Sequence, residues 1–283
     1  LSPSSQNSVV GLKPTIGLLS RTGIVPISST LDTPGPMTKN VTDNAILLDA
    51  MLGKDSQDSK SLNSETGMLS SAMDSASIGD LRLGVMTNLM EADSIYAANV
   101  EALRTAGAQI IEFEPENIPL DGFVTLLNLD MKQDLPAYIA AQVKNKDVVS
   151  VDSVEDVVRF NQQDSLVRIP YGQERLDGIL ADSTSAEEFE EIKINLKESG
   201  RAFFQILEEQ DLDAVLSINN YHAGYAAVAE YPALTVPMGY KANGEPESLT
   251  FIGKPLSEVQ LLRIGKAFED LTKARKIPEG YKN

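Results

Sequence analysis

Serine hydroxyls, a single histidine and a few lysines are the groups in this sequence that could support nucleophilic or acid–base chemistry. His222 is the only histidine among the 283 residues, and there is no cysteine. A thiolate nucleophile, a disulfide and a cysteine metal site are therefore excluded. A Ser–His–Asp triad would have to use His222, while hydrolysis with a lysine or carboxylate base stays open. One histidine cannot build a His-rich zinc or iron centre, so we expect no metal site.

Charged side chains form two further groups. Asp130, Lys132 and Asp134 fall at helical spacing. We favour the interpretation that they form a solvated, charged face of a helix over the alternative that they face a substrate. The acidic residues from 187 to 191 suit the first turn of a helix, because the helix dipole favours negative charge there.

Short apolar runs and longer amphipathic segments alternate along the chain, and they would have to position these groups. A strand at 81–86, a helix at 92–106 and a strand at 109–113 predict a βαβ unit with a parallel strand pair. Pro136 is expected to kink or divide a helix at 121–144. Residues 54–80 are rich in Ser, Asp, Asn and Lys and are expected to form a surface connection. The other predicted strands are 9–12, 23–27, 213–217, 233–237 and 248–252, and the other predicted helices are 40–52, 154–162, 186–210 and 256–274. The pattern predicts an α/β protein with a mixed sheet covered by helices.

The composition excludes several classes of partner. A net charge of −17 disfavours nucleic acid and anionic membranes, since both attract cationic proteins. No apolar stretch reaches the roughly eighteen residues of a membrane span. The lack of cysteine fits a reducing cytoplasm, where we expect the protein. Leu1 has the look of a cut end, because neither an initiator Met nor a signal peptide begins the chain.

The first forty residues carry a family resemblance. They open with LSPSSQNSVVGLKPT and continue with Gly17, Ser20, Arg21, Gly23, Val25, Pro26, Asp32 and the run GPMT at 35–38. This order resembles the downstream half of the amidase signature. The segments 217–220, 231–237, 243–246, 249–253 and 268–269 are similar to the closing part of the same family. The likeness between about 55 and 210 is weak in sequence.

The resemblance implies an amidase-signature fold, a large mixed sheet between helices, of which residues 1–283 would be the carboxyl-terminal portion of a single domain. It also implies a Ser–cis-Ser–Lys relay that hydrolyses a carboxamide without a cofactor. The nucleophile would lie two residues before Leu1, with the bridging serine and the lysine further upstream. None of the three is in this chain, so we expect residues 1–283 to be inactive alone. Leu1 stands where the family commonly has Arg, which puts any substrate contact of that Arg in doubt.

The resemblance also assigns roles within the chain. Lys13 does not match the catalytic lysine and is expected to make a structural hydrogen bond at a strand end. Ser2, Ser4, Ser5 and Ser8 are not the nucleophile by register and are expected to cap the helix or turn after the active-site loop. His222 is not needed by the family's chemistry.

Asn219, Asn220 and Tyr221 follow the predicted strand at 213–217. Because α/β sheets tend to place ligands at the carboxyl ends of strands, these three are the candidate substrate-binding residues. A role as turn residues is the favoured alternative for the two asparagines.

The expected partners are a small amide substrate and the missing upstream portion of the same protein, with a homodimer left open. Two other functions stay open as well. One is the A subunit of a tRNA-dependent amidotransferase, and the other is a non-catalytic α/β binding protein that kept the fold.

Overall fold

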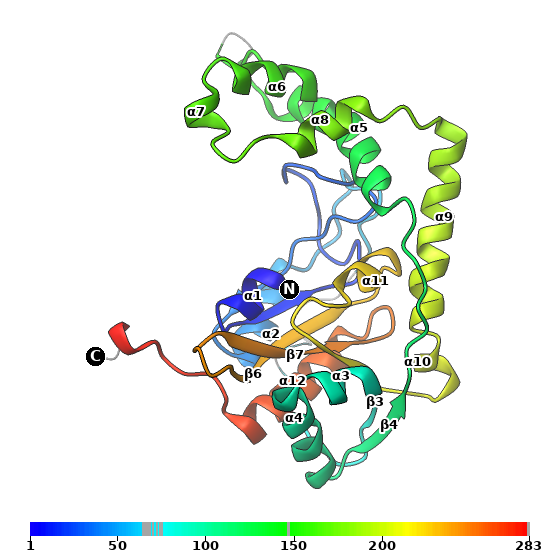
Figure 1. Cartoon of the computed structure of the whole chain (residues 1–283), viewed down its shortest axis with the longest axis vertical. Helices are drawn as coiled ribbons and strands as arrows, with labels where there is room; N and C mark the ends of the chain where they lie inside the picture. The colour runs from blue at the N-terminus through cyan, green and yellow to red at the C-terminus, as the bar shows by residue number, and fades with distance from the viewer. Residues whose placement is uncertain (64–68, 70, 72, 74–75, 146–147, 282–283) are drawn as a thin grey trace. The chain divides into compact units, whose positions relative to one another are not determined.

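The computed structural model describes residues 1–63, 69, 71, 73, 76–145 and 148–281. The chain forms two compact units (Figure 1). The sheet unit contains Leu1–Ser20, Thr33–Ile118 and Ser199–Asn283, and the helical unit contains Arg21–Asp32 and Pro119–Glu198. The prediction of a single domain stays a prediction.

Seven strands build the sheet unit, in the spatial order β2-β1-β6-β7-β5-β3-β4. They are β1 Val10–Lys13, β2 Met37–Thr38, β3 Arg82–Met86, β4 Gln109–Phe113, β5 Ala214–Ile218, β6 Ala233–Tyr240 and β7 Pro246–Ile252. β3 pairs in parallel with β4 and β5, and the other pairs are antiparallel. The predicted mixed α/β sheet and the parallel pair of the βαβ unit are confirmed.

Helices cover both faces of this sheet. The helices of the sheet unit are α1 Ser2–Gln6, α2 Val41–Met51, α3 Thr87–Ala92, α4 Ser94–Thr105, α10 Ile206–Glu209, α11 Ala223–Val228, α12 Glu258–Thr272 and the 3₁₀ turn η2 Glu279–Tyr281. Gly265 of α12 lies against Leu234 and Val236 of β6. α1 packs on the opposite face, against β1, β6 and β7 (Figure 1).

The helical unit contains α5 Phe123–Gln142, α6 Val154–Gln162, α7 Ser165–Arg168, α8 Glu174–Ala181 and most of α9 Ala186–Phe203. Leu135, Ile139, Val154 and Ile179 form a small core of its own. α5 continues through Pro136, so the predicted division there is wrong. The predicted helix at 186–210 ends at Phe203 and resumes as the short α10. α9 begins with Glu187 and Glu188 in its first turn, as predicted.

The predicted strand at 23–27 is wrong. These residues form a turn and irregular bends, and Val25 and Ile27 are 60% and 54% exposed. Pro26 has no N–H to offer a neighbouring strand. The N–H groups of Ile27 and Ser28 instead donate to the Asp32 carboxylate, which fixes a local loop in place of a ladder.

The aspartates of α5 hold this loop. Asp130 is only 2% exposed and accepts hydrogen bonds from the Ser28 hydroxyl and the Thr30 N–H. The Asp134 carboxylate accepts from the Ser29 N–H at 2.6 Å, and burial raises its pKa. The interpretation of Asp130, Lys132 and Asp134 as a solvated face is therefore wrong for Asp130, while Asp134 is half-buried. The loop's backbone donors need buried acceptors, and sequence spacing does not reveal them.

The connection at 54–80 also differs from its prediction. Residues 64–68, 70, 72, 74 and 75 lie outside the described residues. Leu69, Met73 and Ile78 belong to the main core, so this segment is more than a surface connection.

Candidate functional site

Helix α1 lies directly against strand β1 at position 11, where the residue is glycine. A Cβ atom built on Gly11 would lie 2.0 Å from Ser4 Oγ and 2.5 Å from Ser4 Cβ. No side chain can occupy that space without moving the helix. Gly11 therefore sets the height of α1 above the sheet.

A row of small and hydroxyl-bearing residues runs across four strands on this face. Gly11 pairs with Thr235, Thr235 with Thr250, and Thr250 with Ser217. The two threonine hydroxyls are hydrogen-bonded to each other at 3.0 Å, and Thr235, Thr250 and Ser217 are almost completely buried. We call Gly11, Thr235, Thr250 and Ser217 the polar row. Buried hydroxyls need partners, and the row supplies them from within itself and from the loop that follows β5.

The row ends at a serine–histidine contact. Ser217 Oγ lies 2.7 Å from Nδ1 of His222, and the His222 ring stacks on Phe203 with ring centroids 5.2 Å apart. Phe203 also stacks on Tyr225 at 4.0 Å. Burial lowers the pKa of His222 to about 4, so this imidazole is neutral at pH 7. A neutral imidazole beside a buried hydroxyl can exchange a hydrogen bond with it but carries no charge to offer a substrate.

The candidate substrate-binding residues lie in the turn between β5 and α11. Asn219 adopts φ +49°, and its side chain accepts from the Ser248 N–H, so it works as a turn residue against β7. Its carbonyl also accepts from the Thr250 hydroxyl at 2.6 Å. Asn220 and Tyr221 are exposed, Tyr221 at 58%. The loop therefore presents Asn220 and Tyr221 outward and uses Asn219 to anchor itself.

Lys13 ends strand β1 and donates to the Pro14 carbonyl at 3.2 Å, the structural hydrogen bond that was predicted. Burial lowers its pKa to about 8, and Glu258 and Glu230 offset part of that effect.

The predicted capping role of the serines is wrong. Leu1 is the N-cap of α1 and makes no side-chain cap bond, while Ser5 donates to the Ser2 carbonyl. Ser4 lies on Gly11, and Ser8 lies 2.7 Å from the Tyr240 hydroxyl. Ser2, Ser4 and Ser5 lie within the helix and not at its N-cap position, which Leu1 occupies.

Sequence reasoning missed the two threonines of the polar row and also Phe203. Alternation along β6 and along β7 assigns Thr235 and Thr250 each to one face of its own strand. It does not say whether the two faces lie on the same side of the sheet. Only the pairing register shows that they share a face with Gly11 and Ser217.

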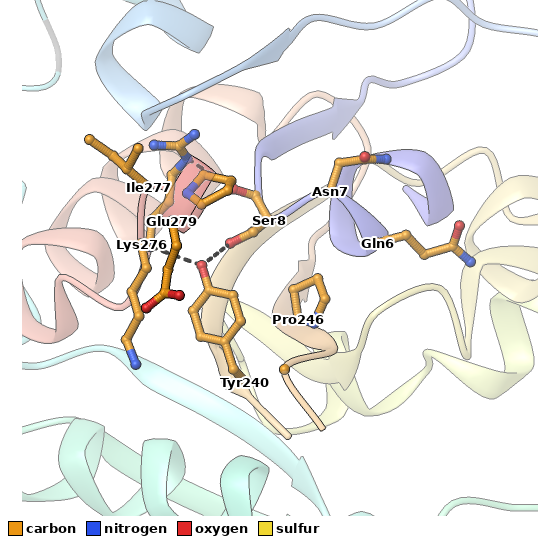
Figure 2. Close-up of a pocket in the computed structure, with 11 residues that line it drawn as sticks. Gln6, Asn7, Ser8, Tyr240, Pro246, Lys276, Ile277 and Glu279 are labelled. Carbon is orange, nitrogen blue, oxygen red and sulfur yellow. Dashed lines mark hydrogen bonds between the residues drawn. The ribbon is translucent and has the colours of Figure 1, made fainter. Parts of the chain in front are cut away.

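A hollow of about 770 Å³ lies at the far end of α1. Gln6, Asn7 and Ser8, the β6–β7 turn and the segment after α12 line it (Figure 2). The β5–α11 loop does not contribute to it. The hollow and the polar row are therefore two separate features, and residues of α1 contact both.

In the described part of the chain, no group of three or more His, Cys, Asp or Glu side chains could hold a metal ion. Among the same residues, no helix has the length and apolar character needed to cross a bilayer.

The mixed sheet flanked by helices, with the short helix α1 packed on a face lined by hydroxyl groups, defines an α/β protein. The amidase family model matches residues 1–217, and the chain belongs to this family. The predicted amidase-signature fold is confirmed by the peptide amidase of Stenotrophomonas maltophilia. That structure is similar with a TM-score of 0.89 and 30% identity, over 99% of this chain and 61% of the other.

Two sequence relatives point the same way. A probable amidase of Arabidopsis thaliana is 33% identical, over 99% of this chain and 56% of that protein. The glutamyl-tRNA(Gln) amidotransferase of Rickettsia bellii has an A subunit that is 28% identical, over 99% of this chain and 62% of that protein. The chain thus spans about three fifths of the length of the relatives it matches.

Proposed function

We propose that this chain is the carboxyl-terminal part of an amidase that hydrolyses a small carboxamide to a carboxylic acid and ammonia or an amine. The observation that carries the proposal is the seating of α1. The helix that begins at Ser2, directly after Leu1, rests on Gly11 and is fixed above the polar row. In the amidase signature, the nucleophilic serine would precede Leu1 by two residues, so this seating would fix its backbone.

A fixed nucleophile backbone suits amide hydrolysis. An amide carbonyl is a poor electrophile, and misplacing an attacking oxygen by about 1 Å can cost roughly a hundredfold in rate. A serine hydroxyl also needs a base that is neutral at the working pH. The resemblance assigns that base to a lysine upstream of Leu1, and Lys13 keeps its structural bond to Pro14.

Residues 219–221 would form one wall of the substrate site. Asn219 anchors the loop to β7, and Asn220 and Tyr221 would contact the substrate from their exposed positions. A Tyr221→Ala change should therefore raise the KM for an amide more than it lowers kcat. Asn219→Ala should destabilise the loop and weaken both parameters.

Ammonia release from a carboxyl-terminal peptide amide and from glutamine provides the test. Residues 1–283 alone should release none above a buffer blank, whereas a protein that also carries the upstream signature residues should turn over one of the two. Turnover by residues 1–283 alone would refute the assignment of the catalytic groups. Turnover of neither substrate by the longer protein, with binding retained, would favour the non-catalytic binding protein.

The amidotransferase protein is the second candidate, supported by the similarity to the Rickettsia bellii relative. It predicts glutamine hydrolysis that rises when the other proteins of the complex are added. The fold likeness to the peptide amidase favours the first candidate.

A further inference from the structure

Glu247 is a carboxyl group that the fold buries almost completely. It is the second residue of β7, its exposed fraction is 1%, and neither carboxyl oxygen accepts a hydrogen bond from a backbone amide or a hydroxyl. Its register partner on β6 is Gly239. An ionised carboxylate in such a place loses the water that stabilises its charge, so burial favours the neutral acid.

One cation reaches Glu247 from its own hairpin. The Lys241 ammonium lies 3.3 Å from Glu247 Oε1, but it also lies 3.3 Å from Glu245 Oε1, and the lysine side chain is 39% exposed. Its charge is therefore shared between two carboxylates and weakened by solvent. The ion pair offsets only part of the cost of burying Glu247.

A second carboxyl group faces Glu247 from helix α4. Asp93 is the N-cap of α4, and its side chain is in hydrogen-bonding contact with that of Glu247. Oδ1 of Asp93 accepts the N–H groups of Ile95 and Tyr96 at 2.9 and 2.8 Å. Two ionised carboxylates cannot bond to each other, because neither has a proton to donate. The contact therefore requires one proton, and Glu247 is the more deeply buried of the two groups.

The first turns of α4 pack closely on the hairpin at this point. A Cβ atom built on Gly239 would lie 2.8 Å from Ile95 Cγ2, and the Asn99 amide donates to the Met238 carbonyl at 3.1 Å. Gly239 is also the residue opposite Glu247. Repulsion between two ionised carboxylates would therefore act directly on a close contact between helix and strand.

We propose that Asp93 and Glu247 share one proton, and that this proton fastens the start of α4 to the β6–β7 hairpin. We call these two residues the carboxyl pair. Loss of the proton brings two negative charges into contact and loosens the helix from the hairpin. Burial and the charge of Asp93 raise the pKa of Glu247, and Lys241 lowers it. Glu245 weakens the effect of Lys241 by competing for it.

The hairpin connects the carboxyl pair with the segment that follows α1. Tyr240 ends β6, and its hydroxyl is bonded to Ser8 Oγ at 2.7 Å and to the Lys276 N–H at 2.8 Å (Figure 2). A shift of the hairpin at Gly239 would thus reach the residues directly after α1. The proposal goes beyond amide hydrolysis and does not depend on it.

Hydrogen exchange at the Ile95 and Tyr96 amides of the 283-residue chain measures the contact, because Asp93 caps both. The folded chain holds the proton of Glu247 more tightly than the unfolded chain. The stabilisation is therefore complete below the ordinary pKa of 4.5 and is lost as the pH rises through the raised pKa. The protection factors of both amides should fall about tenfold for each unit by which the pKa is raised.

The Leu234 amide of β6 is the internal reference for opening of the whole sheet unit. Burial lowers the pKa of His222 and of Lys13, so these two residues make the chain more stable as the pH rises. The effect of the carboxyl pair has the opposite sign. A fall in protection at Ile95 and Tyr96, with none at Leu234, would therefore report the carboxyl pair and not global unfolding.

Three variants separate the carboxyl pair from other charges. Glu247→Gln should keep protection at its low-pH value, because the amide can donate to Asp93 at any pH. Asp93→Asn keeps a helix cap of similar quality and removes the neighbouring charge, so the pKa of Glu247 should fall and the pH-dependent loss should shrink. Glu245→Gln is the matched control. It removes a 56% exposed partner of the same lysine and should leave the fall at Ile95 and Tyr96 in place.

Protection at Ile95 and Tyr96 that does not fall with pH in the unaltered chain would overturn the proposal without any variant having to fold. An equal fall in Glu247→Gln would assign the effect to another group and overturn it as well. Carbon-13 NMR of the glutamate carboxyls gives a direct measurement, and a Glu247 pKa at or below 4.5 would contradict the shared proton. No amide turnover is measured, so failure here is distinguishable from failure of the proposed amidase activity.

Discussion

Replacing Gly11 with alanine should displace α1 and destabilise the sheet unit. The new Cβ would lie 2.0 Å from Ser4 Oγ and 2.5 Å from Ser4 Cβ, both well inside van der Waals contact. Its distance to Thr235 Cγ2 would be an ordinary 3.5 Å, so the clash is with the helix alone. Forcing a methyl group into a packed core costs about 1–3 kcal/mol, and we expect a loss near the upper end.

Ser4→Gly is the second substitution that tests this explanation, because it removes both atoms that would clash with the new Cβ. In the double variant Gly11→Ala/Ser4→Gly, the free energy of unfolding should recover, with a coupling energy of at least about 1 kcal/mol between the two sites. Ser4→Gly alone should cost about 0.5 kcal/mol from its lower helix propensity. Urea unfolding followed by circular dichroism measures the stabilities, and hydrogen exchange at Leu12 and Leu234 reports on β1 and β6 locally.

Gly178→Ala is the matched control. It makes the same chemical change inside helix α8, where an added Cβ meets nothing within 4 Å. Alanine there should stabilise the chain by up to about 1 kcal/mol. If Gly11→Ala left stability within error of the unaltered chain, or if Ser4→Gly failed to rescue it, the claim that Gly11 sets the height of α1 would be refuted.

Three further predictions concern buried ionisable groups. As the only histidine, His222 gives one unambiguous proton NMR titration, which should report a pKa near 4 rather than 6.5. Since the unfolded chain takes up that proton first, stability should fall as the pH drops from about 6.5 to 4, and His222→Gln should lessen the fall. The pKa of Lys13 is lowered from 10.5 to about 8, so stability should rise between those pH values and the rise should be absent in Lys13→Met. Asp130→Ala should cost about 2–3 kcal/mol by removing the carboxylate that accepts from the Ser28 hydroxyl and the Thr30 N–H, and faster hydrogen exchange at Thr30 should accompany the loss.

The sequence predicted those elements whose pattern is local. β3, α4 and β4 were predicted because the periodicity changes from two to 3.6 and back within a short stretch, with Gly107 between helix and strand. The first strand was predicted at 9–12 and lies at Val10–Lys13. Helix α2 was predicted from Asn40, whose side chain does accept the Asp43 N–H.

Features that depend on distant partners were missed. The segment 23–27 has strand-like composition, but Asp32 captures its amides and Pro26 offers none. Asp130 and Asp134 match a solvated face by spacing alone, and only the position of the 28–30 loop shows that both accept hydrogen bonds from it and that Asp130 is buried. The hollow joins residues 6–8, 240–246 and 275–279, and no local pattern links these segments.

The polar row explains how two elements of the proposed site keep a fixed relation to each other. α1 is positioned by Gly11, and Gly11 pairs with Thr235 of β6. The 219–222 loop is positioned by Asn219, which is bonded to Ser248 and Thr250 of β7. β6 and β7 pair from Ala233 opposite Ile252 to Tyr240 opposite Pro246, with one irregularity between Pro237 and Gly239. The helix and the loop are therefore both positioned by the same pair of strands. In the proposed amidase, a nucleophile before Leu1 and a substrate at the loop would therefore keep their spacing through the sheet.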